Sequence, residues 1–176
     1  KQGLQSLPHS GWRMYPPRIA ATIVAELGEQ GIDASAALDG TELVPWQLDV
    51  HTTRVSYQQL EKLVRNALRL SRDPALALRA GLRMRVTAYG MYGTAVLSSA
   101  TGAQFIDFAG LFARVNGPLC DITYQNDSAA TVCVLTPVYW SNSTEDLHRF
   151  SVEFALSAHL TIVRDVLGQT FRFSRV

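Results

Sequence analysis

The chain has 176 residues and a formal net charge of +1, with 47% hydrophobic and 18% charged residues, so a core can form without disulfides or metals. Its two cysteines are too few for a disulfide framework or a four-cysteine zinc site. No apolar run reaches the ~18 residues of a membrane span and the sequence shows no secretion signal, so we expect a cytoplasmic domain without membrane contact.

Hydrophobic periodicity predicts that most of the chain is helical. Residues 1–15 show no period and are expected to form a flexible lead-in, followed by one domain over residues 16–176. The predicted helices span residues 18–30, 34–38, 57–70, 74–80, 91–98, 102–115 and 145–167. Between the second and third helices, residues 41–53 are predicted to be a loop that Trp46 anchors to the core.

Capping signals place several of these helix ends. Capping boxes, in which a hydroxyl side chain precedes a glutamine by three positions, occur at Ser56 with Gln59 and at Thr101 with Gln104. Pro74 is expected at the first position of its helix, and Gly81 is expected to end that helix. The last helix is expected to end at Gly168, because glycine commonly follows a helix C-terminus.

Alternating apolar and polar residues predict a β-hairpin ahead of the last helix. Its arms are residues 120–125 and 131–139, joined by a turn at 126–128. Cys120 and Cys133 would oppose each other if the turn centres on residues 126 and 127, which makes a redox switch conceivable. The alternative is two small buried residues, which we favour because no basic neighbour lowers either thiol pKa.

The predicted helix at 145–167 is apolar around most of its circumference, which is typical of a central, buried helix. A narrow polar stripe along it comprises Arg149, Glu153, Ser157 and Thr161. The sequence therefore predicts an α+β fold that is mostly helical, with a small antiparallel sheet packed on a long buried helix. Residues 171–176 alternate like the first half of a strand, so we expect the chain to be part of a longer protein.

Two glycines three residues apart, Gly90 and Gly93, come directly before an apolar run. They indicate a backbone that turns, or approaches another segment closely, at the start of a buried helix. A dinucleotide-binding fingerprint is not formed, because a third glycine, a preceding parallel strand and a ribose-binding acid are missing. No nucleophile elbow, phosphate-binding loop or zinc-protease motif is present, so we expect neither catalysis nor a cofactor.

The order and spacing of several motifs resemble those of one group of AraC-type bacterial transcription regulators. The motifs are Asp73-Pro74-Ala75-Leu76-x-Leu78, Gly81-Leu82-Arg83, Gly90-x-x-Gly93-x-Ala95, Ser98-Ser99-x-Thr101, the aromatic helix, the hairpin and the long helix ending at Leu167-Gly168. The resemblance covers residues 16–173 and is to the N-terminal, effector-binding half. It implies a domain that senses a small molecule or mediates association, with DNA bound only through a C-terminal pair of helix-turn-helix motifs absent from this sequence.

The histidines do not make a metal site by their spacing. His148 and His159 lie on one side of the predicted long helix, but eleven residues separate them by roughly 16 Å, which prevents a shared ion. His9 and His51 fall in loops without a second ligand nearby. We therefore predict no metal, and expect the two helix histidines to be core or rim residues with satisfied hydrogen bonds.

Residues 54–85 carry eight basic side chains against two acidic ones. Part of this excess forms a basic stripe on one helix, comprising Lys62, Arg65, Arg69 and Arg72. Such a stripe can contact DNA phosphates or hold an anionic effector, but most often it is the solvated face of an amphipathic helix. Readout of bases is disfavoured, because short polar residues in a helix-turn-helix frame are missing.

Aromatic side chains gather in the second half of the chain and indicate either a small-molecule pocket or a plain core. The candidate ligand-binding residues are Tyr89, Met91, Tyr92, Phe105, Phe108, Phe112, Tyr124, Tyr139, Trp140, Phe150, Glu153 and Phe154. A carboxylate on a mostly apolar helix needs a partner, and for Glu153 we expect this to be Arg149, one turn away, rather than a cationic ligand.

These observations predict a ligand-sensing regulatory domain of a homodimeric AraC-type regulator. The effector would be hydrophobic or mixed in character, such as a fatty acid or an amino-acid-like metabolite, and the arginines allow an anion. The alternative is a dimerisation or protein-interaction module without a small-molecule ligand. An enclosed cavity bordered by Tyr89, Phe108 and Phe154 would favour sensing, whereas a solid core with an exposed apolar patch would favour association.

Overall fold

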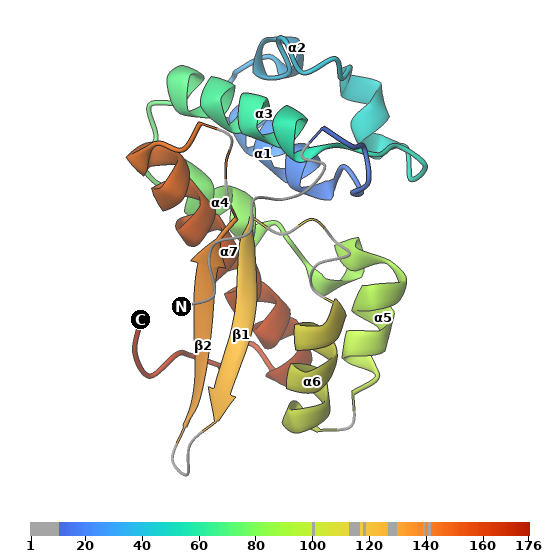
Figure 1. The fold of residues 1–176 in the computed structure, drawn as a ribbon, viewed down its shortest axis with the longest axis vertical. Coiled ribbons are helices and arrows are strands. Elements are labelled where there is room, and N and C mark those ends of the chain that lie inside the picture. Colours follow the sequence, from blue (N-terminus) through green and yellow to red (C-terminus); the bar gives the residue numbers. More distant parts are fainter. Residues whose placement is uncertain are drawn as a thin grey trace.

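The computed structural model describes residues 11–99, 101–112, 117, 119–126, 130–138, 140 and 142–176, and its fold is α+β and mostly helical, as predicted. In chain order the elements are α1 (Arg18–Glu29), α2 (Ala34–Ala37), η1 (Pro45–Asp49), α3 (Tyr57–Leu70), α4 (Leu76–Leu82), η2 (Val86–Tyr89), α5 (Met91–Leu97), α6 (Gly102–Phe112), β1 (Cys120–Asn126), β2 (Thr131–Pro137) and α7 (Glu145–Leu167). Helices α1, α2 and α3 form a layer at the top of Figure 1, and α5 and α6 lie beside the two strands in the lower half.

Helix α7 runs through the whole molecule, from the helical layer at the top to the lower half behind β1 and β2 (Figure 1). The hydroxyl of Thr144 accepts a hydrogen bond from the backbone N–H of Leu147, and two acidic residues in the first turn favour the positive end of the helix dipole. Gly168, with φ 108°, ends the helix. Eleven of its 23 residues are buried, so both the predicted bounds and the predicted central position are confirmed.

Helices α4 and α7 pack at very short range around Gly81. A Cβ atom at this position would lie 2.1 Å from the Oγ atom of Ser157 and 2.4 Å from the carbonyl oxygen of Phe154. Ser157 and Thr161, two members of the predicted polar stripe, are therefore buried against α4, and their hydroxyls donate to carbonyls of the preceding turn of α7. The prediction that Gly81 ends its helix is wrong, because the residue lies inside α4 and permits this contact.

The beginnings of two helices test the capping predictions. At the start of α3, Ser56 and Gln59 form the predicted capping box. The prediction that Pro74 begins the next helix is wrong, because α4 starts at Leu76. The carboxylate of Asp73 accepts the backbone N–H two residues further on, so residues 73–75 form a turn that delays the helix.

Strands β1 and β2 form the predicted antiparallel hairpin, and they make a two-stranded sheet among the described residues. Its register pairs Cys120 with Pro137, and Tyr124 with Cys133. The two cysteines therefore do not oppose each other, which removes the condition for a redox switch; Cys120 is buried and Cys133 is half-buried, close to the favoured interpretation. The predicted turn at 126–128 begins one residue too early, because Asn126 still belongs to β1, opposite Thr131; residues 127–129 lie outside the described part.

Two groups of buried side chains divide the core. The upper cluster contains side chains from α1, α3, α4 and the first half of α7, among them Ile23, Leu60, Ala77, Phe150 and Phe154. The lower cluster consists of Val86, Val96, Phe105, Ala109, Ile162 and Val163. Because α7 contributes to both clusters, its side chains are shared between the two halves of the molecule.

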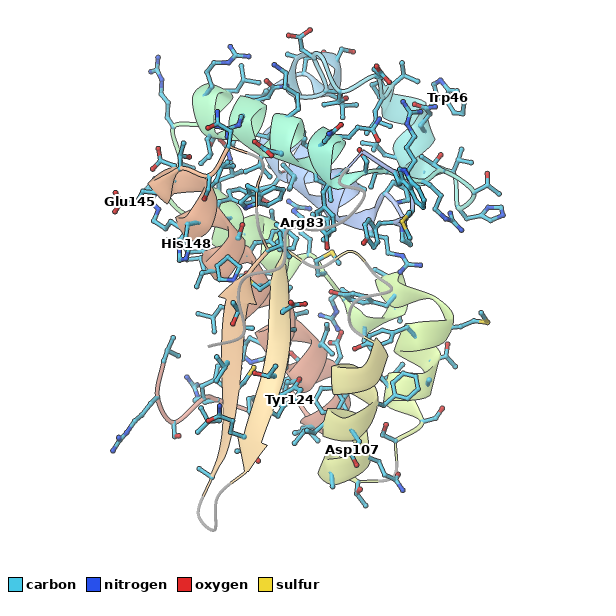
Figure 2. All side chains as sticks on the ribbon, in the orientation of Figure 1. Trp46, Arg83, Asp107, Tyr124, Glu145 and His148 are labelled. Carbon is cyan, nitrogen blue, oxygen red and sulfur yellow. The ribbon has the colours of Figure 1, made fainter. Side chains whose placement is uncertain are left out.

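The segment before α3 differs from its prediction. The prediction that Trp46 anchors residues 41–53 to the core is wrong, because Trp46 lies on η1 and is 66% exposed. Figure 2 shows it at the periphery of the helical layer. Leu43 and Thr41 are buried instead, and the carbonyl of Thr41 accepts a 2.8 Å hydrogen bond from the side-chain amide of Gln59. Of the predicted lead-in, residues 11–15 are described, and Tyr15 forms an antiparallel bridge with Val55.

Candidate functional site: a cavity between the two clusters

A cavity lies where the upper and lower clusters meet. Its volume is about 60 Å³. Its wall is formed by Ile19, Met84, Tyr89, Tyr92, Leu119, Cys120, Ile122, Phe154, Ala155, Ala158, His159 and Ile162. These residues come from α1, the segment from α4 to α5, β1 with the residue before it, and α7, so segments far apart in the sequence meet here.

Helix α7 provides the longest part of the wall. Phe154, Ala158 and Ile162 are four residues apart and share one face of the helix, and Ala155 lies beside them. Phe154 and Ala158 belong to the upper cluster and Ile162 to the lower one. The two alanines leave space that a longer side chain would fill, so the cavity depends on small residues in the middle of the helix.

The glycine junction places two tyrosines at the cavity. Gly90 has φ 56°, a conformation that favours glycine, and it turns the chain between Tyr89 and the helix α5 that carries Tyr92. A Cβ atom at Gly93 would lie 1.9 Å from the carbonyl oxygen of Val86, so α5 touches the backbone of η2 directly. The predicted turn and close approach are both confirmed, and the two tyrosine rings lie 5.7 Å apart.

The polar groups of the wall are all neutral at pH 7. Burial raises the pKa of Tyr92 to about 12, and burial also raises the pKa of Tyr89. Burial, and to a smaller extent the charge of Asp121, raises the pKa of the Cys120 thiol to about 12. Burial lowers the pKa of His159 to about 4, which leaves its imidazole uncharged. The cavity is therefore lined by apolar atoms with four uncharged polar side chains.

His159, a residue of the cavity wall, has two aromatic neighbours. Its side chain is buried, and its ring stacks on Phe173 at a centroid distance of 6.0 Å with 12° between the planes. The ring of Tyr124, on β1, also lies close to the His159 ring, with 5.8 Å between the two centroids. The hydroxyl of Tyr124, whose position on β1 is marked in Figure 2, is buried and has no hydrogen-bond partner among the described residues. No hydrogen bond to the His159 ring is present within the described part of the chain.

The structure brings three of the predicted ligand-binding residues to the cavity wall, namely Tyr89, Tyr92 and Phe154. Four others lie one layer further out. Phe105 belongs to the lower cluster, Phe108 packs on Tyr92 with ring centroids 5.6 Å apart, Tyr124 packs on His159, and Phe150 stacks on Phe154 at 6.1 Å. The cavity expected to be bordered by Tyr89, Phe108 and Phe154 thus has two of these residues in its wall.

The remaining predicted residues lie elsewhere. Met91 is 90% exposed, and Trp140 is buried in the upper cluster, where its indole N–H donates a 3.0 Å hydrogen bond to the hydroxyl of Ser151. The carboxylate of Glu153 is paired with Arg149 at 3.7 Å, as predicted. Tyr139 and the side chain of Phe112 lie outside the described part of the structure.

Sequence reasoning missed the aliphatic and small wall residues. Ile19, Met84 and Leu119 are ordinary core residues by their pattern, so nothing local distinguishes them. A partial signal was present on the long helix, where Ala155 and Ala158 fall on the face that also carries Phe154. In a close-packed interior, however, the room left by a small residue is usually filled by a neighbouring element, so this pattern alone does not locate a cavity.

The sequence matches a known protein family over most of its length. A family model described as the arabinose-binding domain of AraC transcription regulators, N-terminal, matches residues 31–176. The chain belongs to this family. The Ornithine utilization regulator of Pseudomonas aeruginosa is 35% identical over 104 residues, which are 59% of this chain and 31% of that protein. No solved structure gave a significant match. The family consists of regulators of transcription and is not a class of enzymes.

Three residues of the predicted basic stripe of this AraC-family domain, Lys62, Arg65 and Arg69, lie on α3, whereas Arg72 lies two residues beyond its end. Arg65 is half-buried and forms a 2.9 Å ion pair with Glu61, whereas Lys62, Arg69 and Arg72 are exposed. The stripe does not contribute to the cavity wall. Its interpretation as a solvated helix face or as a surface for an anion stays a prediction.

The titratable groups of this domain do not gather in a metal-binding pattern within the described residues. His148 is exposed near the start of α7, as Figure 2 shows, whereas His159 is buried in the cavity wall. The prediction that both are core or rim residues holds for their positions, but the expected hydrogen bond of the His159 ring is not found among the described residues. The helices within the described ranges are too short or too polar to cross a membrane.

Proposed function

We propose that the chain is the effector-binding domain of a cytoplasmic, homodimeric AraC-type transcription regulator, and that a small molecule binds in the cavity between the two clusters. One observation carries this proposal: the cavity wall takes residues from both clusters, with Phe154 and Ala158 above and Ile162 below. A ligand in this position touches both halves of the domain at once. Family membership supports a regulatory role, because the family is one of transcription regulators.

The proposed mechanism is a shift between two arrangements of the domain. A bound molecule fills space between side chains on α7 and on the Tyr89–Tyr92 junction, and so favours the arrangement in which the two clusters are further apart. The free energy of ligand binding is then available to bias the position of a DNA-binding domain elsewhere in the whole protein. The wall residues that we assign to ligand contact are Tyr89, Tyr92, Phe154, Ala155, Ala158 and His159.

Thermal unfolding in the presence of a metabolite library tests the proposal, because a ligand that binds only the folded chain raises the melting temperature. Ala155→Leu places three further carbon atoms at the cavity wall and should abolish the shift caused by any hit. Ala25→Leu, on the exposed side of α1, makes the same chemical change outside the cavity and should retain the shift.

The result that contradicts the proposal is a set of hits whose shifts are the same in the Ala155→Leu and Ala25→Leu variants, since those ligands would bind elsewhere. A library without any hit would also count against sensing. If Ala155→Leu shows no cooperative unfolding, Ala155→Val makes a smaller change at the same position and serves in its place.

A second candidate function, a protein-interaction module without a small-molecule ligand, is favoured by exposed apolar side chains on and beside η1. Val44 is 44% and Trp46 is 66% exposed. Sedimentation equilibrium of the chain and of Trp46→Ser helps to distinguish the two candidate functions. Two results together would favour this candidate over sensing: an association of the intact chain that Trp46→Ser loses, and a melting temperature of the intact chain that no library compound raises.

A further inference from the structure

We infer that the ligand of this cavity is an uncharged, mainly apolar small molecule with one or two hydrogen-bonding groups. The inference rests on the proposed sensing function and narrows its ligand class. It separates this domain from the ligands that the names of its relatives suggest. Ornithine carries a carboxylate and two ammonium groups, and arabinose carries a hydroxyl on nearly every carbon, so neither matches a wall of this composition.

The first argument is the absence of a charged partner. None of the residues in the cavity wall is an aspartate, glutamate, lysine or arginine. A charged ligand group moved from water into such a site loses its hydration without gaining an ion pair, and the resulting penalty is large. An ammonium or carboxylate group is therefore rejected by the wall itself.

Of the charged residues next to wall residues in the sequence, Arg83, Arg85 and Glu153 are in ion pairs. Asp121 alternates along β1 with the wall residues Cys120 and Ile122, so its side chain lies on the other face of the strand. The ion pairs adjacent in sequence to wall residues are Arg83–Glu26, Arg85–Asp165 and Arg149–Glu153, with N–O distances of 2.8, 2.6 and 3.7 Å. The Asp165 carboxylate also accepts a 2.9 Å hydrogen bond from the backbone N–H of Val86, which holds η2 on α7. Releasing such a group toward a ligand would break contacts that position the cavity wall.

Arg18 is a further cation close in sequence to the cavity wall, because it directly precedes the wall residue Ile19. A Cβ atom at Gly90 would lie 3.2 Å from Nη2 of Arg18, so the guanidinium lies over the glycine turn. It is not part of the cavity wall. Its pKa is lowered, chiefly by burial. This cation therefore lies at the glycine turn and is not one of the groups that line the cavity.

The second argument is the small number of hydrogen-bonding groups. Of the four polar side chains in the wall, the thiol of Cys120 already donates a 3.3 Å hydrogen bond to the carbonyl of Ser151, which leaves the hydroxyls of Tyr89 and Tyr92 and the imidazole of His159. A neutral imidazole has one donor and one acceptor nitrogen, so it suits a single hydroxyl or carbonyl group. A polyol would leave several of its hydroxyls buried without partners, which costs affinity for each one.

The third argument is size. The accessible space of about 60 Å³ is smaller than an engineered apolar cavity of about 150 Å³ that takes up benzene. A small ligand with a short apolar chain fits first, and a larger one requires movement of the flexible side chain of Met84 or of the tyrosines. Suitable probes are therefore molecules of four carbon atoms that carry different polar groups on a short apolar chain.

The experiment is a titration of the isotope-labelled chain, observed by NMR through the methyl groups of Ile19, Ala158 and Ile162. The probes are 1-butanol, butylamine and butyrate at pH 7.5, with L-ornithine and L-arabinose added separately. We expect saturable methyl shifts with 1-butanol, and binding of butylamine and butyrate weaker by at least about a hundredfold. Ornithine and arabinose should produce no saturable shift, and Ala155→Leu should lose the shifts that 1-butanol causes.

The outcomes separate the two proposals. Binding of butylamine, butyrate, ornithine or arabinose as tight as that of 1-butanol, and lost in Ala155→Leu, would overturn the inference about ligand class while leaving the sensing function in place. Absence of saturable binding by all five probes, or 1-butanol binding that Ala155→Leu does not weaken, would overturn the use of this cavity for sensing. Ala25→Leu serves as the control, and its spectra should respond as those of the unchanged chain.

Discussion

Replacing Gly81 by alanine tests the contact between α4 and α7 on which the cavity depends. The added Cβ would lie 2.1 Å from the Oγ atom of Ser157 and 2.4 Å from the carbonyl oxygen of Phe154. Ser157 can rotate away, but the carbonyl is main chain, so α4 and α7 must move apart. Such overpacking costs about 3 kcal/mol, and the higher helix propensity of alanine returns about 1 kcal/mol. We expect a net loss of about 2 kcal/mol in the free energy of unfolding.

Urea denaturation followed by circular dichroism measures this change, and Gly28→Ala is the matched control. Gly28 also lies in a helix, but no atom lies within 4 Å of a Cβ added there, so alanine should stabilise the chain by about 0.5–1 kcal/mol. Adding Ser157→Ala to Gly81→Ala should recover less than half of the loss. Equal stability of Gly81→Ala and the unchanged chain would refute the reasoning, as would full recovery in the double variant, because the carbonyl contact would then be harmless.

Three further predictions concern titratable groups. Burial lowers the pKa of His159 from 6.5 to about 4, so the stability contributed by its neutral imidazole is fully present above pH 6.5 and is lost as the pH falls toward 4. We expect the free energy of unfolding to drop by about 3 kcal/mol over this range, and His159→Gln to remove that part of its dependence on pH. Arg83→Met leaves the buried carboxylate of Glu26 unpaired and should lower the free energy of unfolding by about 1–3 kcal/mol in urea titrations at pH 7. Cys120 and Cys133 should not form an intramolecular disulfide under mild oxidation, because they are not opposite in the sheet; mass spectrometry of the oxidised chain checks this. Both thiols should react with a thiol reagent much faster in denaturant, as reagent kinetics can show, since burial in the folded chain raises their pKa to about 12 and about 11.

Local sequence signals predicted the elements whose ends depend on their own residues. The capping hydroxyl of Thr144 and the terminal Gly168 define α7, and the Ser56–Gln59 box defines the start of α3. The same kind of reasoning failed at Gly81, where a typical stop signal serves a contact with a helix more than seventy residues away in the sequence. A glycine looks the same in the chain whether it ends a helix or admits a neighbouring one, so only the tertiary structure separates the two.

The candidate site shows the same division. The aromatic residues are visible in the sequence, but their places in the fold are not. The ring of Phe150 fills the core, whereas the ring of Tyr92 borders the cavity. Trp46 illustrates the error, because a large apolar residue in a loop was expected in the core and lies in solvent. Which of these fates applies depends on the space left by small residues from other elements, and local pattern carries no information about that space.

The sequence by itself determined the helices, the hairpin, the central position of α7 and the family to which the chain belongs, because these follow from periodicity, caps and motif order along the chain. Only the tertiary structure decided that Ala155 and Ala158 lie opposite Tyr89 and Tyr92 around unfilled space, and that the wall bears no charge. The physical reason is that a cavity is the volume that side chains from distant segments fail to fill, and that volume exists only once the segments have packed together.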